Sequence, residues 1–132
     1  MGISIDKVMQ YHETALLLRT KRSEVLAANI ANANTPGYKA QDFDFSRALK
    51  EAVSSQQTSM IKTHPDHYGA SSNSVNAAMQ YIVPFQTGTG DGNTVDLPSM
   101  QTAFAQNAME YQMSLRFLNS KIKGMMTALK GQ

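Results

Sequence analysis

The chain has 132 residues, of which 42% are hydrophobic and 17% are charged, and its formal net charge is +2. This length allows one modest domain. The absence of cysteine excludes a disulfide framework, a zinc ribbon and a thiol nucleophile. No run approaches the roughly 20 apolar residues of a membrane span, and the first ten residues lack the apolar core of a signal peptide. We therefore expect a soluble chain without a cleaved signal.

The charge is concentrated at the C-terminal end. Residues 97–132 contain four Lys or Arg side chains and one Glu. That excess is too small for nucleic-acid binding, and no aromatic residues alternate with the basic ones. We expect neither a nucleic acid nor a small-molecule substrate as a partner.

Residues 3 to about 33 contain neither Pro nor Gly and are rich in Leu, Ala, Arg and Lys, which favour a long helix. This helix carries two apolar series. The first is Val8, Tyr11, Ala15, Leu18 and Val25, interrupted by Arg22, and the second is Ile5, Met9, Leu16, Leu26 and Ile30. Two series form a broader apolar surface than one partner helix covers.

The helix ends in the segment Asn-Thr-Pro-Gly-Tyr. Thr35 precedes a proline, which disfavours helical geometry, and Pro36-Gly37 is the central pair of a type II turn that directs Tyr38 back towards the helix or towards a neighbour. Asn29 and Asn32 lie three residues apart on one helix face. Their amides either solvate the helix end or face a neighbouring subunit, and we favour the subunit contact.

Residues 46–95 form a polar middle segment that we expect to be loop-rich and to fold firmly only against other surfaces. The run Met79–Phe85 is the only one that resembles a strand, and Pro84 restricts it to an edge or a bend. Two short motifs in this segment suggest chemistry. His64 and His67 lack a third metal ligand, and the glycine-rich run 88–92 lacks the lysine of a phosphate loop, so we interpret them as a solvated turn and a flexible loop.

The C-terminal segment, residues 96–132, predicts a second long helix. Asp96 is a candidate N-cap, Pro98 is tolerated in the first turn, and Gly131 ends the helix. A heptad seam indicates packing along its length. The seam consists of Phe104, Ala108, Tyr111, Leu115, Leu118, Ile122, Met125 and Leu129.

These patterns predict a mainly α fold in one structural domain, with an irregular, partly extended middle. Residues 1–45 hold the first helix and its turn, residues 46–95 the middle, and residues 96–132 the second helix. The two helices should pack as a coiled-coil-like hairpin. We expect its packing residues to be Ile5, Leu16, Leu26, Ile30, Phe104, Tyr111, Leu115, Leu118, Ile122 and Met125. No constellation of residues indicates catalysis, a metal or a cofactor, so we do not expect an enzyme.

The segment "LAANIANANTPGYKAQDFDF" (residues 26–45) resembles the N-terminal signature of the flagellar basal-body rod family. The matching motif is Ala31, Asn32, Thr35, Pro36, Gly37 and Tyr38. "DGNTVDL" (residues 91–97) and the helix after it resemble the C-terminal part of a proximal rod protein, and the short chain also fits that type. The resemblance covers residues 1–45 and 91–132.

This resemblance implies a structural subunit that assembles helically into the periplasmic rod of the flagellum, the drive shaft and export channel for motility. It also implies export through the flagellar type III system without a cleaved signal. The implied partners are copies of the chain, FlgC-type and distal rod proteins, the rod-base adaptor FliE, the export gate, the inner-membrane ring and a rod-cap protein. The alternative is a soluble helical adaptor or chaperone of the same secretion system, which would fold stably alone in the cytoplasm.

Overall fold

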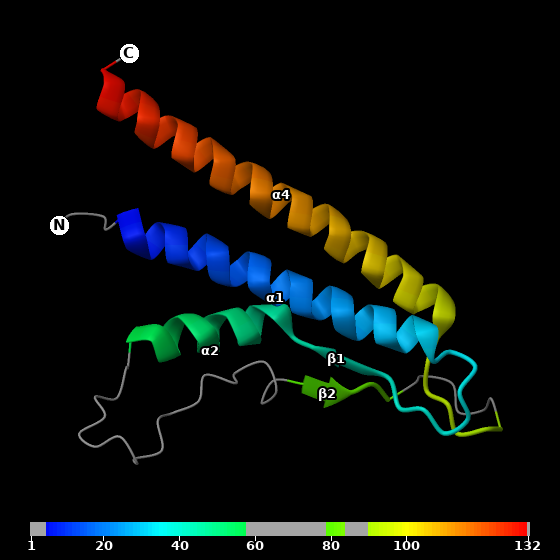
Figure 1. Cartoon of the computed structure of the whole chain (residues 1–132). Coiled ribbons are helices and arrows are strands. Elements are labelled where there is room, and N and C mark those ends of the chain that lie inside the picture. The colour runs from blue at the N-terminus through cyan, green and yellow to red at the C-terminus, as the bar shows by residue number, and fades with distance from the viewer. Residues whose placement is uncertain (1–4, 58–78, 84–89, 132) are drawn as a thin grey trace, which may run out of the picture.

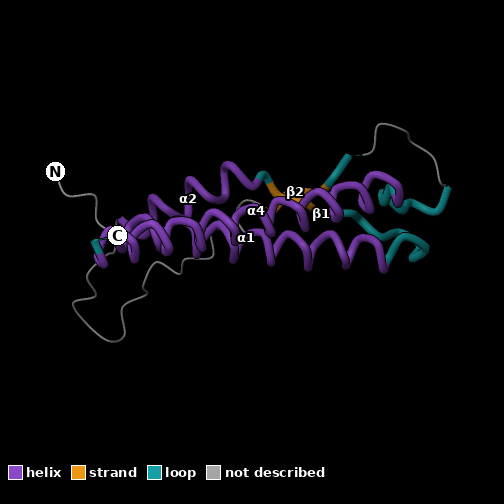
Figure 2. Tube along the Cα trace, turned by 90° about the horizontal axis from the view of Figure 1, so that it is seen from above, coloured by secondary structure: helices purple, strands orange, loops and turns teal. Residues whose placement is uncertain are grey.

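The computed structural model describes residues 5–57, 79–83 and 90–131, and these residues form a long helical hairpin with a smaller layer along one side (Figure 1). The element order is α1 (Ile5–Ala31), β1 (Gln41–Phe43), α2 (Phe45–Gln57), β2 (Met79–Tyr81) and α4 (Leu97–Lys130). Helices α1 and α4 run antiparallel, so the start of α1 and the end of α4 lie at the same end of the hairpin, as Figure 2 also shows. The predicted α fold with long terminal helices is therefore confirmed.

Helix α1 lies between α4 on one side and α2 with β1 on the other (Figure 1). Its two predicted apolar series meet these two neighbours. Leu18, from the first series, is buried in the cluster shared with α2, and Leu26, from the second, is also buried. The excess apolar surface of α1 is thus largely covered within the chain.

Helix α2 is an element that the sequence analysis did not predict, because the polar run after it suggested a loop. Asp44 caps its start, since its Oδ1 accepts hydrogen bonds from the backbone N–H groups of Ser46 (2.9 Å) and Arg47 (3.3 Å). Its apolar residues recur at helical spacing and face α1. They are Phe45, Ala48, Leu49, Ala52 and Val53.

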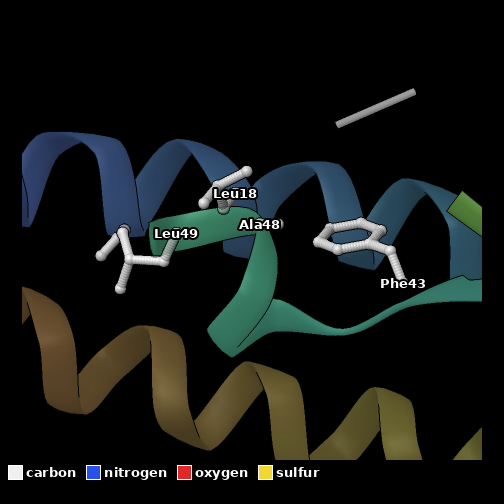
Figure 3. Packing of buried hydrophobic residues seen from close by; sticks show 5 residues of the cluster. Leu18, Phe43, Ala48 and Leu49 are labelled. Atoms are coloured by element: carbon white, nitrogen blue, oxygen red, sulfur yellow. The ribbon is translucent and has the colours of Figure 1, made fainter. Parts of the chain in front are cut away.

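The hydrophobic core is small and sits where α1 meets β1 and α2 (Figure 3). Its buried members are Ala15, Leu18, Phe43, Ala48 and Leu49. Val25, Phe45 and Val53 pack around them. Arg19 adds a cation–π contact at the edge, with its guanidinium carbon 4.1 Å from the centre of the Phe45 ring. This core joins the α2 layer to α1 and leaves α4 outside it.

Strands β1 and β2 form a short antiparallel pair in which Gln41 lies opposite Tyr81 and Phe43 opposite Met79. The predicted strand-like run therefore does contain a strand, Met79–Tyr81. A backbone hydrogen bond from Ile82 N to the carbonyl of Ala40 extends the pairing by one step (2.9 Å). The pair fixes the chain that leaves α1 beside the chain that returns towards α4.

Helix α4 has the predicted ends. Asp96 occupies the N-cap position, but its side chain bonds no backbone N–H group there and accepts a hydrogen bond from the Ser99 hydroxyl instead. A proline occupies the first turn, and Gly131 closes the helix in the left-handed conformation with φ 71°. Within the described part of the chain, no helix is long and apolar enough to cross a membrane.

Leu18 and Leu17 provide a matched test of the core. Leu18 is 1% exposed and packs against α2, whereas Leu17, its neighbour in the chain, is 69% exposed. Leu18→Ala should lower the free energy of unfolding by about 3 kcal/mol. Leu17→Ala should change it by less than about 0.5 kcal/mol. Urea unfolding followed by far-UV circular dichroism measures both. Equal effects of the two substitutions would contradict the packing of α1 against α2.

Candidate functional site: the junction at the closed end of the hairpin

The motif residues predicted from the sequence gather where α1 ends and α4 begins. We call this region the junction, and it comprises residues 29–41 and 91–100. The first segment contains the Asn-Thr-Pro-Gly-Tyr turn and the second contains the Asp-Gly-Asn-Thr run. The two segments are about 60 residues apart in the sequence and bond directly to each other. The closed end of the hairpin is therefore built from both halves of the chain.

Asn29 is completely buried at the centre of the junction. Its side-chain amide bonds the backbone of Gln41 in both directions: Nδ2 donates to the carbonyl oxygen (2.6 Å), and Oδ1 accepts from the N–H group (3.1 Å). Oδ1 also accepts from the hydroxyl of Tyr38 (3.3 Å), and Nδ2 lies 3.5 Å from the sulfur of Met100. The Asn29 side chain therefore makes with Gln41 the two backbone hydrogen bonds that a residue of a neighbouring strand would make.

The Thr-Pro-Gly-Tyr turn has the predicted geometry. Gly37 has φ 73°, a value that favours glycine, and the N–H group of Tyr38 bonds the carbonyl of Thr35 (3.3 Å). The turn directs the Tyr38 side chain back towards α1, where its hydroxyl reaches Asn29. The predicted type II turn is therefore confirmed, and of the two directions left open for Tyr38 the structure shows the one towards the helix.

Asn93 supplies the cap that the end of α1 lacks. Its Nδ2 lies 3.0, 2.9 and 2.9 Å from the carbonyl oxygens of Asn32, Ala33 and Thr35, which follow the last turn of α1. Its Oδ1 accepts from the N–H group of Val95 (2.8 Å), which fixes the entry to α4. One buried side chain therefore satisfies the end of one helix and positions the start of the other.

Backbone pairing around Asn93 completes the junction. Gly37 N donates to the Asp91 carbonyl (2.9 Å) and Thr94 N to the Tyr38 carbonyl (3.0 Å). The hydroxyl of Thr94 accepts from Ala40 N (2.8 Å), and Lys39 Nζ donates to the Gly92 carbonyl (2.6 Å). The junction is thus held by hydrogen bonds more than by apolar packing.

Beyond the junction, polar side chains set the register of α1 against α4. The buried Nδ2 of Asn107 donates to the Arg19 carbonyl (2.9 Å) and to the Ser23 hydroxyl (2.8 Å), while its Oδ1 has no hydrogen-bond partner within the described residues. Arg19 also pairs with Glu110 and donates to Ser114 (3.3 Å). A polar residue in a helix seam fixes register at a cost in stability.

Two ion pairs flank this seam. Arg22, which interrupts the first apolar series of α1, forms a bidentate ion pair with Asp42, with nitrogen–oxygen distances of 2.8 and 3.0 Å. Hydrogen bonding to Asp42 raises the pKa of Arg22, although partial burial acts to lower it. Burial alone would raise the pKa of Glu110. Hydrogen bonds from Gln106 and Arg19, with the charge of Arg19, outweigh it and lower that pKa below its ordinary value. All these charges act within the chain.

The preferred interpretation of Asn29 needs a correction. We expected Asn29 to face a neighbouring subunit, but it is fully buried and both its amide atoms bond groups of the same chain. Asn32 is half-buried, and its side chain serves the helix end: Nδ2 donates to the Ala28 carbonyl (2.8 Å), and Oδ1 accepts from the Thr35 hydroxyl (3.1 Å). Thr35, Pro36 and Gly37 are exposed at the tip of the junction.

The predicted packing residues divide into two groups. Leu26 is fully buried, and six others are half-buried: Leu16, Ile30, Tyr111, Leu118, Ile122 and Met125. Phe104 and Leu115 remain 38% and 40% exposed, and the seam positions Ala108 and Leu129 are also exposed, so the expected seam is wrong at these four positions. The physical reason is that smaller or polar side chains, Ala103, Asn107 and Ser114, face α1 in this half of α4. Ile5 begins α1, and its side chain lies outside the described residues.

Asn93 is the residue that sequence reasoning missed. Its run was noted only as part of a resemblance, and the middle segment was assigned to loops. One signal was available in the sequence. Asn93 lies between Gly92 and Thr94 shortly before the start of the C-terminal helix, and the predicted N-terminal helix ends without a capping residue of its own. His64 and His67 lie outside the described residues. Among the side chains that are described, no group of three His, Asp or Glu residues could hold a metal ion.

Comparison with known proteins identifies the family. Residues 9–39 match the family described as "Flagella basal body rod protein". The chain is 48% identical over 132 residues to the "Flagellar basal body rod protein FlgB" of Aeromonas hydrophila, covering 100% of this chain and 99% of that protein. The chain belongs to the FlgB family. The FlgB proteins of Escherichia coli K12 and Salmonella typhimurium are 42% and 43% identical to it, each alignment covering 96% of this chain and 95% and 96% of the relative.

The segment that matches the family model ends inside the junction. Residues 9–39 run along α1 and continue into the Thr-Pro-Gly-Tyr turn. The two helices of the hairpin are thereby locked at one end and have no comparable clasp among the described residues at the other. The junction therefore joins the end of α1 to the start of α4.

Removing the Asn93 side chain tests the clasp. Asn93→Ala leaves the carbonyls after α1 without their shared donor and should lower the free energy of unfolding by about 1–3 kcal/mol. Asn34→Ala is the matched control, because Asn34 is exposed in the same turn and should change stability by less than about 0.5 kcal/mol. Thermal unfolding of the two variants measures the difference. Equal stability of Asn93→Ala and the original chain would contradict the capping role.

Proposed function

We propose that this chain is a structural subunit of the proximal part of the flagellar basal body rod. Full-length similarity to FlgB proteins, at 48% identity with one of them, supports the rod assignment. The similarity spans α1, the junction and α4 together, so the whole hairpin is the shared unit. Assembly with other rod components and a place in the flagellar basal body follow from membership in this family.

The observation that carries this proposal is the apolar surface of α4. Seven large apolar side chains of this helix are between 38% and 62% exposed: Leu97, Phe104, Met109, Met113, Leu115, Phe117 and Met126. By helical spacing they lie outside the seam that faces α1, with Leu97, Phe104, Leu115 and Met126 on one side of α4 and Met109, Met113 and Phe117 on another. A soluble monomer rarely exposes this many large apolar side chains, whereas an assembling subunit covers them with its neighbours.

The chemistry of this surface suits adaptable packing between non-identical neighbours. Met109 and Met113 are flexible and polarisable, and such side chains fit irregular partner surfaces. We propose that the neighbours are copies of the chain, FlgC-type and distal rod proteins, and the rod-base adaptor FliE. Transient contacts with the export gate, the inner-membrane ring and a rod-cap protein belong to the same proposal. The family resemblance of residues 1–45 and 91–132 supports these partners.

The proposal extends to route and location. A rod subunit acts in the periplasm, and export by the flagellar type III system requires no cleaved signal. The relatives are structural rod proteins, and we assign this chain no catalytic step.

The alternative function, a secretion adaptor or chaperone in the cytoplasm, is not favoured. An adaptor of this size would need to fold stably alone and to cover its apolar surface with one partner. The relatives are named as rod proteins over their full length, which favours the structural subunit. Fractionation separates the two functions, because a rod subunit cofractionates with basal bodies and an adaptor stays in the cytoplasm.

Charge placed on the apolar surface of α4 should block assembly without unfolding the chain. Met113 is 53% exposed, so Met113→Glu should leave the helicity of the purified chain unchanged. In cells lacking the native protein, it should abolish swimming and rod assembly, because a carboxylate would be buried at a subunit contact. Gln112→Glu adds the same charge at an exposed polar position beside it and should support swimming. Normal rods built from Met113→Glu chains would contradict the proposal.

A further inference from the structure

The open end of the hairpin, opposite the junction, holds an unfilled cleft. It lies between the first turns of α1 and the last third of α4 and has a volume of about 650 Å³. Its lining residues include His12, Phe117, Lys121, Gly124 and Met125. A Cβ atom added at Gly124 would meet no atom within 4 Å, so this part of the cleft is open to an entering side chain.

The cleft lies in the most basic part of the described chain. Arg116, Lys121, Lys123 and Lys130 form no ion pair among the described residues, and no acidic residue follows Glu110 in the sequence. By contrast, Arg19 and Arg22 of α1 are both paired with carboxylates. Of these four, Lys121 lines the cleft, and an ammonium group beside an apolar cleft suits an apolar side chain with a carboxylate close to it.

The outer face of α1 presents that combination. Leu17 is 69% exposed, and Glu13 lies one helical turn before it on the same face. Among the carboxylates whose side chains are described, Glu13 alone forms neither an ion pair nor a hydrogen bond. The Glu13 carboxylate and the exposed leucine thus complement Lys121 and the open cleft, within the part of the chain that the structure describes.

We propose that Leu17 of one copy of the chain enters the cleft beside Gly124 of a second copy, with Glu13 pairing with Lys121 across the contact. This contact rests on the proposed function and assigns it one specific surface. It joins two different faces of the same chain, so each copy offers both a donor face and an acceptor cleft. Such a head-to-tail contact adds subunits in succession and does not stop at a dimer, unless the rotation closes into a ring.

A single chain cannot make this contact with itself. Glu110 pairs with Arg19 and Asn107 bonds Ser23, so Leu17 lies opposite about residue 112 of α4. Gly124 is a further 12 residues along, about 18 Å at the helical rise per residue. A disulfide requires Cα atoms within about 7 Å. Cysteines at these two positions can therefore form a disulfide only between chains.

The chain contains no cysteine, so introduced cysteines report this contact without background. Chains with Leu17→Cys and chains with Gly124→Cys are produced together in cells lacking the native protein, and isolated basal bodies are oxidised. We expect a disulfide-linked dimer of one chain of each type. Lys50→Cys, an exposed position on α2, replaces Gly124→Cys in the control and should give no such dimer with Leu17→Cys.

Exchanging the charges of Glu13 and Lys121 tests whether these two side chains pair or merely lie near each other. Adding Glu13→Lys to the Leu17→Cys chain should lower the yield of the dimer about fivefold, the upper range for an exposed ion pair. Adding Lys121→Glu to the Gly124→Cys chain at the same time should restore it, because the two charges are exchanged. Lys50→Glu has the same charge change as Lys121→Glu at a distant site and should restore nothing.

The outcomes distinguish this contact from the proposed function. If both cysteine variants are incorporated into basal bodies but give no mixed dimer, the contact is wrong and the function stands. The contact is also wrong if the Leu17→Cys chain forms as much disulfide-linked dimer with the Lys50→Cys chain as with the Gly124→Cys chain. It is likewise wrong if the charge substitutions at Glu13 and Lys121 leave the yield of the dimer unchanged. Exclusion of the Leu17→Cys and Gly124→Cys chains from basal bodies that admit the Lys50→Cys chain would support the contact, because only the first two substitutions alter it. Absence of the unmodified chain itself would contradict the proposed function.

Discussion

Two buried asparagine side chains hold this structure together, and both act on backbone groups where α1 ends. Asn29 pairs with the peptide groups of Gln41, and Asn93 bonds three carbonyls beyond the last turn of α1. Buried backbone groups without partners are costly, so the hairpin closes only when both halves of the chain are present. The apolar core beside α2 is too small to impose this geometry on α4.

This constraint explains why α4 exposes so much apolar surface. Once the junction fixes its start, the residues that face α1 are largely small or polar: Ala103, Asn107, Glu110 and Ser114. Larger side chains such as Phe104 and Leu115 are turned to the flank. A monomer evolved for its own stability would place them in the seam. Their exposure is understood as part of a surface completed by neighbouring rod subunits.

The sequence predicted the features that depend on local chemistry. Thr35-Pro36-Gly37 predicts its turn because proline and glycine restrict φ, and the ends of α4 follow from Asp96 and Gly131. Contacts between distant segments were not predictable from spacing alone. The heptad pattern of α4 could not show that Asn107, and not Phe104, faces α1, nor could the polarity of Asn93 reveal the carbonyls it bonds. Helix α2 was predictable from its apolar spacing and was missed because a polar run follows it.

Hydrogen exchange of the isolated chain, followed at individual backbone amides, tests the central role of the junction most directly. The amides of Gly37, Ala40, Gln41 and Thr94 bond across the junction, and they should be among the most slowly exchanging in the chain. Amides in the last third of α4, whose side chains are mostly exposed, should exchange much faster. Stronger protection in the last third of α4 than at the junction would contradict the account.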